Sequence, residues 1–297
     1  MDMQNPFKPM HVSATHEDFV GNNGIGRYLL LPGSDGRAKG IAEGFENLEV
    51  RHHPRGHNVY LGTLNHKGQK LDVASVSSGM GCPSMEIILH ELFNLGARRF
   101  LRVGTAGSLQ PQQVKLGDLV NVQASVRDEN TTTHYAPLSV PAVASIEVIL
   151  SVLKAAEKLK LTDVIHTGVV HCKSSFYARE FSAGPQASEN DAFLALLTEC
   201  DVLASEMETA ALFIQSQIYN HQLMQQGTGP AFRVLSGAIL GILAIPPDLF
   251  ITKEEEKATT EKLLQLAFES IKSLAEIDFS SASGIKNQAF RQYAGVS

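Results

Sequence analysis

The feature that most constrains the fold is an alternation of short apolar runs with segments of helical periodicity. Tyr28–Leu31 is an apolar run that stops at Pro32 and Gly33. Pro83–Leu95 carries apolar residues at the three- and four-residue spacing of a helix, and Gly96 is a suitable helix end. Strands that alternate with helices in this way form a mostly parallel or mixed sheet covered by helices. We therefore predict an α/β fold.

The same alternation continues along the chain. Apolar or β-branched runs predict strands over Val59–Leu64, Leu71–Val76, Phe100–Val103, Asp118–Ala124, Val164–Cys172, Val202–Ser205 and Phe232–Leu243. Helical spacing predicts helices over Val143–Leu159, Asn190–Cys200, Met207–Ile218 and Lys253–Leu274. The stretch from about Ser280 is typical of a surface tail. Because no Pro-, Gly- or Ser-rich linker divides the chain, we expect a single domain over 1–297, with its core at about 10–275.

Composition excludes several classes of protein. The chain has 25 Lys and Arg against 31 Asp and Glu, a net charge of -6, whereas backbone binding of nucleic acid favours a basic excess. No apolar run reaches the roughly 18–20 residues of a membrane helix, and the first residues lack a signal-peptide pattern. Cys82, Cys172 and Cys200 are too few and too widely spaced for a disulfide framework or a zinc site. We expect a cytoplasmic protein with no nucleic-acid, membrane or metal partner.

Two glycine-rich turns follow predicted strands. Leu31–Arg37 passes through Gly33, and Arg37 stands where a helix could start, so free N–H groups and a guanidinium could hold an anion. Ser77–Ser84 allows a ligand to approach the backbone closely. Taken alone, Leu31–Arg37 is more simply a plain strand-to-helix turn, and Ser77–Ser84 could equally be a tight turn.

Charged and aromatic residues stand near the ends of other strands. Arg102 lies inside an apolar strand, where it needs either a structural carboxylate or a bound anion as its partner. Ser205–Thr209 contains Glu206 and Glu208, which could bind sugar hydroxyls or simply favour the start of a helix through its dipole. Phe176 follows a long strand and could stack on a base, although most Phe residues are core.

Together, and in this order, these segments resemble the nucleoside phosphorylase-I family, and the whole chain is most similar to its uridine phosphorylase branch. The matching pieces are LPGSDGR, SSGMGCPSMEIILHEL, FLRVGTAGSLQPQQVKLGDLV, ASVRDENTTTHYAPLSVPAV, SSFY and SEMETAALF. The resemblance covers roughly residues 10 to 275. It implies a single-domain three-layer α/β/α fold with a central mixed, partly barrel-like sheet.

The resemblance also implies roles for particular residues. The phosphate-binding positions match Gly33, Arg37, Arg102 and Thr105, with Arg55 reaching the neighbouring subunit's phosphate. The ribose-binding positions match Met207 and Glu208, with His11 crossing the same interface. The base-binding positions match Phe176, Glu180, Ile239 and Leu240. Arg102 and Glu208 are the expected catalytic residues, and sites shared in this way imply a homo-oligomer built on a two-fold dimer.

The implied reaction is phosphorolysis of a pyrimidine nucleoside, most simply uridine and phosphate to uracil and ribose 1-phosphate. Phosphate arrives ionised, so no activating base is needed, and catalysis rests on positioning and electrostatics. Phosphate is a substrate, and we expect no cofactor. The stretch 237–241 lacks the acid that purine members place late in the chain, which disfavours a purine base.

The sequence departs from the family at the base. Glu180 and Ser182 stand where the pyrimidine branch carries Gln and Arg, although Arg179 and Gln186 are near enough to substitute. Glu86 replaces an expected small residue, so we do not carry over the family's interface cation. The alternatives are a phosphorylase with another base preference, a nucleosidase, and a largely non-catalytic nucleoside-binding protein. Release of ribose 1-phosphate that depends on phosphate distinguishes the enzyme from the non-catalytic protein, base release without phosphate would indicate a nucleosidase, and a panel of nucleosides determines the base.

Overall fold

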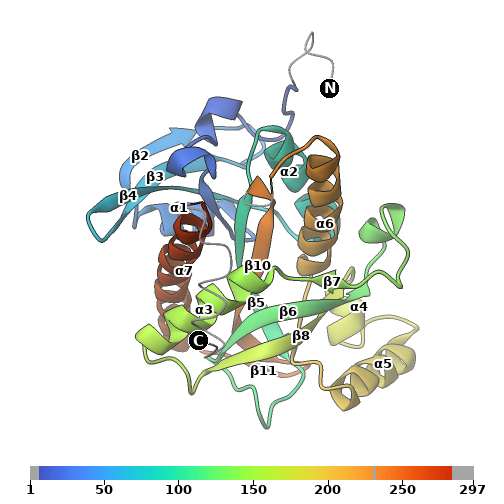
Figure 1. Ribbon diagram of the computed structural model, residues 1–297. Helices are drawn as coiled ribbons and strands as arrows, with labels where there is room; N and C mark the ends of the chain where they lie inside the picture. Colours follow the sequence, from blue (N-terminus) through green and yellow to red (C-terminus); the bar gives the residue numbers. More distant parts are fainter. Residues whose placement is uncertain (1–6, 230–231, 283–297) are drawn as a thin grey trace, which may run out of the picture.

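The computed structural model describes residues 7–229 and 232–282 (Figure 1). Its strands are β1 (Tyr28–Leu31), β2 (Glu46–Arg51), β3 (Val59–His66), β4 (Gln69–Val76), β5 (Arg99–Ser108), β6 (Leu119–Asp128), β7 (Ala142–Val143), β8 (Ile165–Lys173), β9 (Ala204–Glu206), β10 (Leu235–Ile245) and β11 (Leu249–Phe250). Its helices are α1 (Asp35–Ala42), α2 (Gly81–Asn94), α3 (Ile146–Lys158), α4 (Phe176–Glu180), α5 (Ala187–Glu199), α6 (Thr209–Gln225) and α7 (Lys253–Ala282). Short 3-10 helices are η1 (His16–Asp18), η2 (Asn22–Gly24) and η3 (Thr131–His134).

The strands form one mixed sheet that partly closes on itself. Its order is β11-β10-β6-β8-β9-β5-β1-β4-β3-β2, with β7 beside β6, and β10 pairs a second time, in parallel, with β5. The second pairing closes β5, β10, β6, β8 and β9 into a barrel, while β1 to β4 continue outward. The predicted mixed, partly barrel-like sheet is therefore confirmed.

Helices cover both faces of this sheet. On one face α3 and α7 lie together, with α1 nearby, and they pack on residues such as Tyr28 and Leu101 (Figure 1). On the other face α2 and α6 pack on alternate residues of the same strands, such as Leu29 and Phe100. Because side chains alternate across a strand, strands buried on both faces are apolar throughout. This explains the continuous apolar runs in the sequence and confirms three layers.

Gly104 shows how closely the barrel wall is packed. A Cβ at Gly104 would lie 2.8 Å from Cδ2 of Leu240 and 2.9 Å from Nη2 of Arg102. Real Cβ contacts are longer, so only glycine fits between these two side chains. The position therefore lets the Arg102 guanidinium lie against the strand from which it projects.

Several element boundaries differ from the predictions. The segment 46–51 was not predicted as a strand, because its apolar alternation is limited to Leu48 and Val50 among charged, exposed residues, yet it pairs with β3 at the sheet edge. The helix predicted from Val143 begins at Ile146, because Ala142 and Val143 pair with β6. The last helix continues past Leu274 to Ala282. The rest of the predicted tail, 283–297, lies outside the described residues.

The long helix α7 covers the sheet rather than a membrane. Leu266, Ile271 and Leu274 are buried against the α3 face. Its first turn carries Glu254, Glu255 and Glu256. Within residues 7–229 and 232–282, no helix combines the length and the apolar character required to cross a bilayer.

Candidate active site

Arg102 lies at the centre of a buried cluster of charges, in the first half of β5 and beside Leu31, the last residue of β1. Its side chain is 5% exposed; Nε donates to Oε2 of Glu206 at 3.2 Å, and Nη2 donates to Oε2 of Glu208. The third guanidinium nitrogen, Nη1, is buried, and no acceptor for it exists among residues 7–229 and 232–282. An unpaired buried donor is costly, so Nη1 is available to a bound anion.

The two carboxylates beside Arg102, those of Glu206 and Glu208, accept hydrogen bonds from different parts of the chain. Glu206 accepts from the backbone N–H groups of Glu208 and Thr209, both at 2.9 Å, and from the Thr209 hydroxyl at 2.5 Å. Glu206 thereby satisfies free donors at the start of α6, as a helix cap does. Glu208 instead accepts from the N–H of Gly81 at 2.6 Å, which ties it to the second glycine-rich turn.

Their protonation follows from these partners. Burial raises the pKa of Glu206, but the charge of Arg102 and the hydrogen bonds from Thr209 outweigh burial, so its pKa is lowered. Burial raises the pKa of Glu208; Arg102 opposes this and Glu206 adds to it, so its pKa is raised. Burial would lower the pKa of Arg102, yet the two carboxylates raise it. The cluster thus holds a fixed cation, a fixed anion and one carboxylate that takes up a proton more readily.

Both glycine-rich turns lead to this cluster. A Cβ at Gly33 would lie 3.1 Å from Nη2 of Arg37 and 3.7 Å from the carbonyl oxygen of Gly79. Burial and then repulsion by Arg102 lower the pKa of Arg37. A Cβ at Gly81, whose φ is +82°, would lie 4.0 Å from Cε of Met207. The structure therefore brings Gly33, Arg37, Arg102, Met207 and Glu208 together near the ends of β1 and β9.

The predicted residues of β5 and β10 divide between two environments. Thr105 is half-buried in β5, opposite Gly241 of β10. The side chain of Leu240 and the guanidinium of Arg102 both lie against the backbone of Gly104. Ile239 points to the opposite face, into the core beneath α3 and α7. Only Leu240 of the two β10 residues is brought to the charged cluster.

The base end holds a buried ion pair that the sequence analysis missed. Lys173, the last residue of β8, is 1% exposed. Its ammonium lies 2.7 Å from Oε1 of Glu180 and 5.7 Å from the ring centre of Phe176. It donates to the Ser205 hydroxyl at 3.0 Å and to the Glu206 carbonyl at 3.4 Å. The signal in the sequence was a lysine that directly follows a buried strand.

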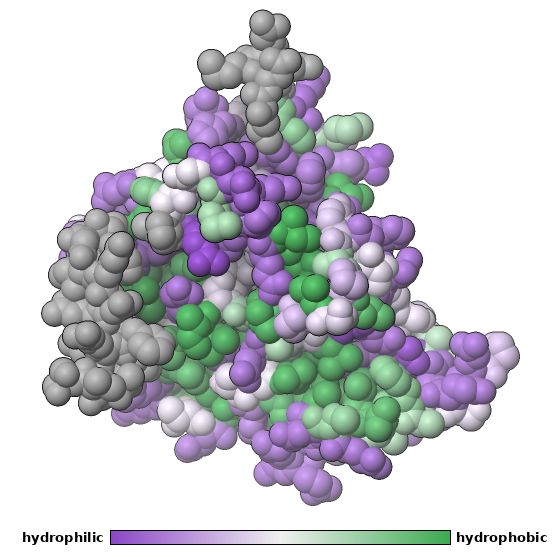
Figure 2. Space-filling model, turned by 45° about the vertical axis from the view of Figure 1, so that its right-hand side comes forward, coloured by the Kyte–Doolittle hydropathy of each residue, from purple (hydrophilic) through white to green (hydrophobic). Residues whose placement is uncertain are grey.

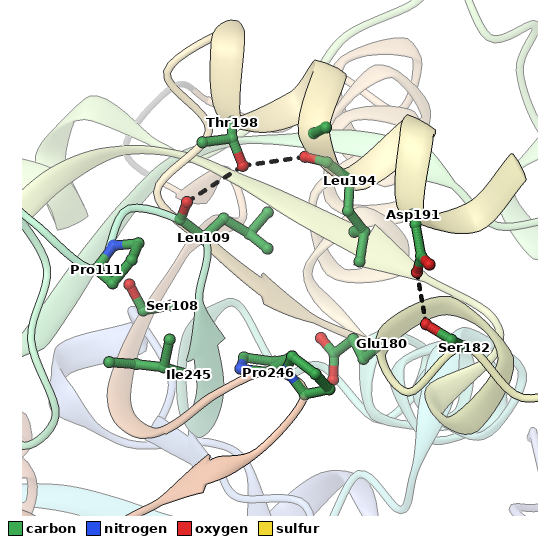
Figure 3. Close-up of a pocket in the computed structure, with 12 residues that line it drawn as sticks. Ser108, Leu109, Pro111, Glu180, Ser182, Asp191, Leu194, Thr198, Ile245 and Pro246 are labelled. Carbon is green, nitrogen blue, oxygen red and sulfur yellow. Dashed lines mark hydrogen bonds between the residues drawn. The ribbon is translucent and has the colours of Figure 1, made fainter. Parts of the chain in front are cut away.

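A cavity of about 320 Å³ opens beside Glu180. Figure 3 shows the Glu180 carboxylate pointing into this space, which is also lined by Leu194 of α5, by Ile245 at the end of β10 and by Pro246, which follows it. Ser182 also lines it, but its hydroxyl donates to Asp191 at 2.6 Å. The cavity is thus mostly apolar, with an acidic edge.

Arg179, considered above as a substitute base-binding group, is occupied elsewhere. Nε and Nη2 both donate to the carboxylate of Asp128 at 2.8 Å, and Nη1 donates to Asn190 at 2.5 Å. His171 holds the same Asp128 at 2.8 Å. A bidentate pair of this kind is among the stronger polar contacts, so turning Arg179 toward a base would break three hydrogen bonds.

The two residues expected to serve a neighbouring subunit lie apart from the charged cluster. The carboxylate of Glu91 accepts from the backbone N–H of His11 and lies 2.7 Å from its Nδ1. This contact fixes the ring and leaves Nε2 for another partner. Arg55 is exposed in the loop before β3, and its side chain has no hydrogen bond or ion pair within the described part of the chain.

Known proteins resemble this chain over most of its length. A family model described as the phosphorylase superfamily matches residues 27–228. A uridine phosphorylase of Treponema pallidum is 33% identical over 256 residues, which cover 86% of this chain and 92% of the relative. A uridine phosphorylase of Thermococcus kodakarensis is 32% identical, covering 86% and 84%. A guanosine phosphorylase of Halorubrum lacusprofundi is 29% identical, covering 62% and 69%.

A closed mixed barrel with a buried Arg–carboxylate cluster at its strand ends, together with these matches, defines the class: the chain belongs to the phosphorylase superfamily. Within it, the chain is a nucleoside phosphorylase, a pentosyltransferase whose family binds a nucleoside and phosphate.

Proposed function

We propose that the chain catalyses the phosphorolysis of uridine to uracil and ribose 1-phosphate. The observation that carries this proposal is the buried, unpartnered Nη1 of Arg102, because phosphate supplies the acceptor that the protein lacks there. The nearby Arg37 adds a second guanidinium, and such forks match phosphate oxygens well. The uridine phosphorylases of Treponema pallidum and Thermococcus kodakarensis support the choice of base.

The mechanism follows from the charges. A phosphate oxygen attacks the anomeric carbon, the bond from that carbon to the base nitrogen breaks, and the base leaves with the electron pair and gains a proton from solvent. As the bond loosens, the sugar becomes cationic. Arg102 and Arg37 hold the attacking phosphate, while ionised Glu208 holds ribose hydroxyls and stabilises the cationic sugar. Glu206 keeps the start of α6 and Arg102 in position.

Arg55 and His11 belong to the neighbouring site in this proposal. Both lie outside their own chain's charged cluster, and Glu91 fixes the His11 ring. Figure 2 shows apolar residues gathered on one face of the molecule and bordered by polar ones. Exposed apolar side chains include Met80, Ile87 and Leu138. Surfaces of this kind mark protein interfaces, which supports a two-fold dimer with shared sites.

The test is a nucleoside panel incubated with and without phosphate, with ribose 1-phosphate and free base measured separately. We expect uridine cleavage that requires phosphate and yields the two products in equal amounts. Base release without phosphate would indicate a nucleosidase. Cleavage of guanosine but not uridine would contradict the choice of base and leave the phosphorylase assignment intact.

A further inference from the structure

We propose that Lys173 and Glu180 together bind the base and determine its identity, in place of the Gln and Arg expected from the resemblance. The pair would select bases that have a carbonyl or ring-nitrogen acceptor near the sugar, followed by a ring N–H donor. This inference rests on the proposed function, since it assumes that a nucleoside binds with its ribose at Glu208. The bases that qualify are uracil, thymine and the oxopurines. Cytosine and adenine do not qualify.

Glu180 has acceptor capacity that the protein leaves unused. It is 5% exposed, and its one polar partner in residues 7–229 and 232–282 is Lys173, whose ammonium lies 2.7 Å from Oε1. A carboxylate has two oxygens with about four acceptor sites, so one ammonium does not use them all. The carboxylate also faces the cavity (Figure 3). A buried carboxylate with open lone pairs is a suitable acceptor for a ligand N–H.

Lys173 lies between the sugar side and Glu180. Two of its N–H groups go to Ser205 and to the Glu206 carbonyl, next to the residues placed at the ribose. The third remains for Glu180 or for a ligand, since an ammonium has three donors. A base that lies along Phe176 therefore meets a donor first and an acceptor second, counted outward from the sugar.

This order matches some bases and not others. In uracil, the O2 carbonyl adjoins the sugar-bearing nitrogen and would accept from Lys173, and the next ring atom, N3–H, would donate to Glu180. Cytosine presents an unprotonated N3 at that point, which the Glu180 charge repels. Guanine offers its N3 acceptor and then N–H donors, so the same pair would also accept it. The ammonium would further stabilise the negative charge on the departing base.

The experiment separates a reading role from a structural one by removing the two charges singly and together. Lys173→Met and Glu180→Gln each leave one buried charge unpaired, which destabilises a fold. The double variant removes both charges, so its melting temperature should recover toward that of the wild type. The matched control makes the same two changes at Lys158 and Glu269, a Lys–Glu pair that joins α3 to α7.

The readout is kcat/KM for uridine, 3-methyluridine, cytidine and guanosine, with phosphate present. The wild type should prefer uridine over 3-methyluridine and over cytidine by about 30-fold or more, because each analogue leaves Glu180 unpaired. Lys173→Met and the double variant should lose about 30-fold or more on uridine. The double variant should also discriminate against 3-methyluridine by less than about 3-fold. The control pair should change neither value.

Several results would overturn the proposal. One is a double variant that regains wild-type uridine cleavage along with its stability, which would make the pair structural. Another is equal cleavage of uridine and 3-methyluridine by the wild type. A gain in uridine cleavage in the double variant Glu180→Gln with Ser182→Arg would show that the native residues do not bind the edge of the base. Calorimetry of uracil and 3-methyluracil binding, with phosphate present, tests the pair even if the proposed turnover fails.

Discussion

The two ends of the site are built on opposite principles. At the phosphate–ribose end, Arg102 meets Glu206 and Glu208, and each of these groups is held by further hydrogen bonds from its own backbone or neighbours. At the base end, the one polar partner of Glu180 among the described residues is the Lys173 ammonium, and the carboxylate faces a cavity. At the first end the side chains hold one another in place before a ligand arrives, and only Nη1 of Arg102 lacks an acceptor among the described residues. At the second end a single ion pair holds the carboxylate beside the cavity.

This difference separates reaction from specificity. The charged cluster fixes where phosphate and sugar meet, so it determines which bond is broken for every nucleoside. The Lys173–Glu180 pair acts only on the base edge, so it determines which nucleoside is used. Changes at the first end should therefore lower turnover of all substrates equally, whereas changes at the second should reorder them.

The largest effect is expected at Arg102. Arg102→Ala removes the phosphate fork and should lower kcat/KM by about 30- to 1,000-fold, or about 2–4 kcal/mol. Because the change also leaves two buried carboxylates unpaired, circular dichroism should first establish that the variant is folded. Arg102→Lys keeps the charge and should lose somewhat less.

A control for Arg102 is available four residues earlier, just before the same strand begins. Arg98 donates to the carbonyls of Phe93 and Ala97, before β5 begins. Arg98→Ala should leave the KM for phosphate unchanged. Equal phosphate affinity and turnover in the wild type and a folded Arg102 variant would break the assignment of this end.

Shared sites predict recovery of activity on mixing two defective chains. Arg55→Ala and Glu208→Ala homodimers should each be nearly inactive. With random exchange, half of the dimers are mixed and one site in each is intact, so about a quarter of wild-type activity should return. Fluorescence transfer between labelled chains establishes that exchange has occurred. No recovery after proven exchange would place Arg55 outside the neighbour's site.

The pH dependence should report Glu208 rather than Glu206. The pKa of Glu208 is raised and its ionised form is required, so activity should be lost as pH falls through that raised pKa, above the ordinary value of 4.5. Glu206 has a lowered pKa and stays ionised over this range. The measurement is log kcat against pH at saturating phosphate. An acid limb that persists in Glu208→Gln would assign it to another group.

The smallest effect is expected far from both ends, at Glu276 of α7. It pairs with His66, Lys67 and Lys154, which joins α7 to the β3–β4 hairpin and to α3. Partial burial would raise the pKa of Glu276, but the two lysines outweigh burial and lower it to about 2. A lowered folded-state pKa stabilises the protein above the ordinary value near 4.5, and this gain is lost as pH falls toward 2.

Glu276→Gln should therefore lower the free energy of unfolding by about 1 kcal/mol at pH 7, after allowance for solvent screening. The difference from the wild type should shrink between pH 4.5 and 2, while uridine cleavage at pH 7 stays unchanged. Urea unfolding at several pH values measures this. A difference that does not depend on pH would show that packing, not charge, makes the contribution.

Much of the fold was predictable because strands such as β1 and most of β10 are buried on both faces and are therefore continuous apolar runs. The edge strand β2 was not predicted, because it is mostly exposed and its apolar residues are limited to Leu48 and Val50. At the site, glycine turns and an arginine in an apolar strand signalled Gly33, Arg37 and Arg102, because those types are costly or unusual in such places.

The contacts at the base end could not be predicted from the sequence, for a physical reason. Lys173 and Glu180 stand seven positions apart, on β8 and on the short helix α4, and nothing in their spacing shows that both side chains turn inward. Likewise, the sequence left Arg179 of α4 available to bind a base, whereas in the structure Asp128, the last residue of β6, holds its guanidinium. Contacts made between elements, rather than along them, decide these roles.

The most direct test of the account is the uridine to 3-methyluridine ratio of kcat/KM, measured in Arg102→Lys and in Lys173→Met with Glu180→Gln. The account predicts that Arg102→Lys lowers both values and leaves the ratio at its wild-type level, because phosphate is common to both reactions. It predicts that the double variant reduces the ratio about tenfold or more. A ratio that moves in Arg102→Lys, or that stays constant in the double variant, would contradict the division of the site into two ends.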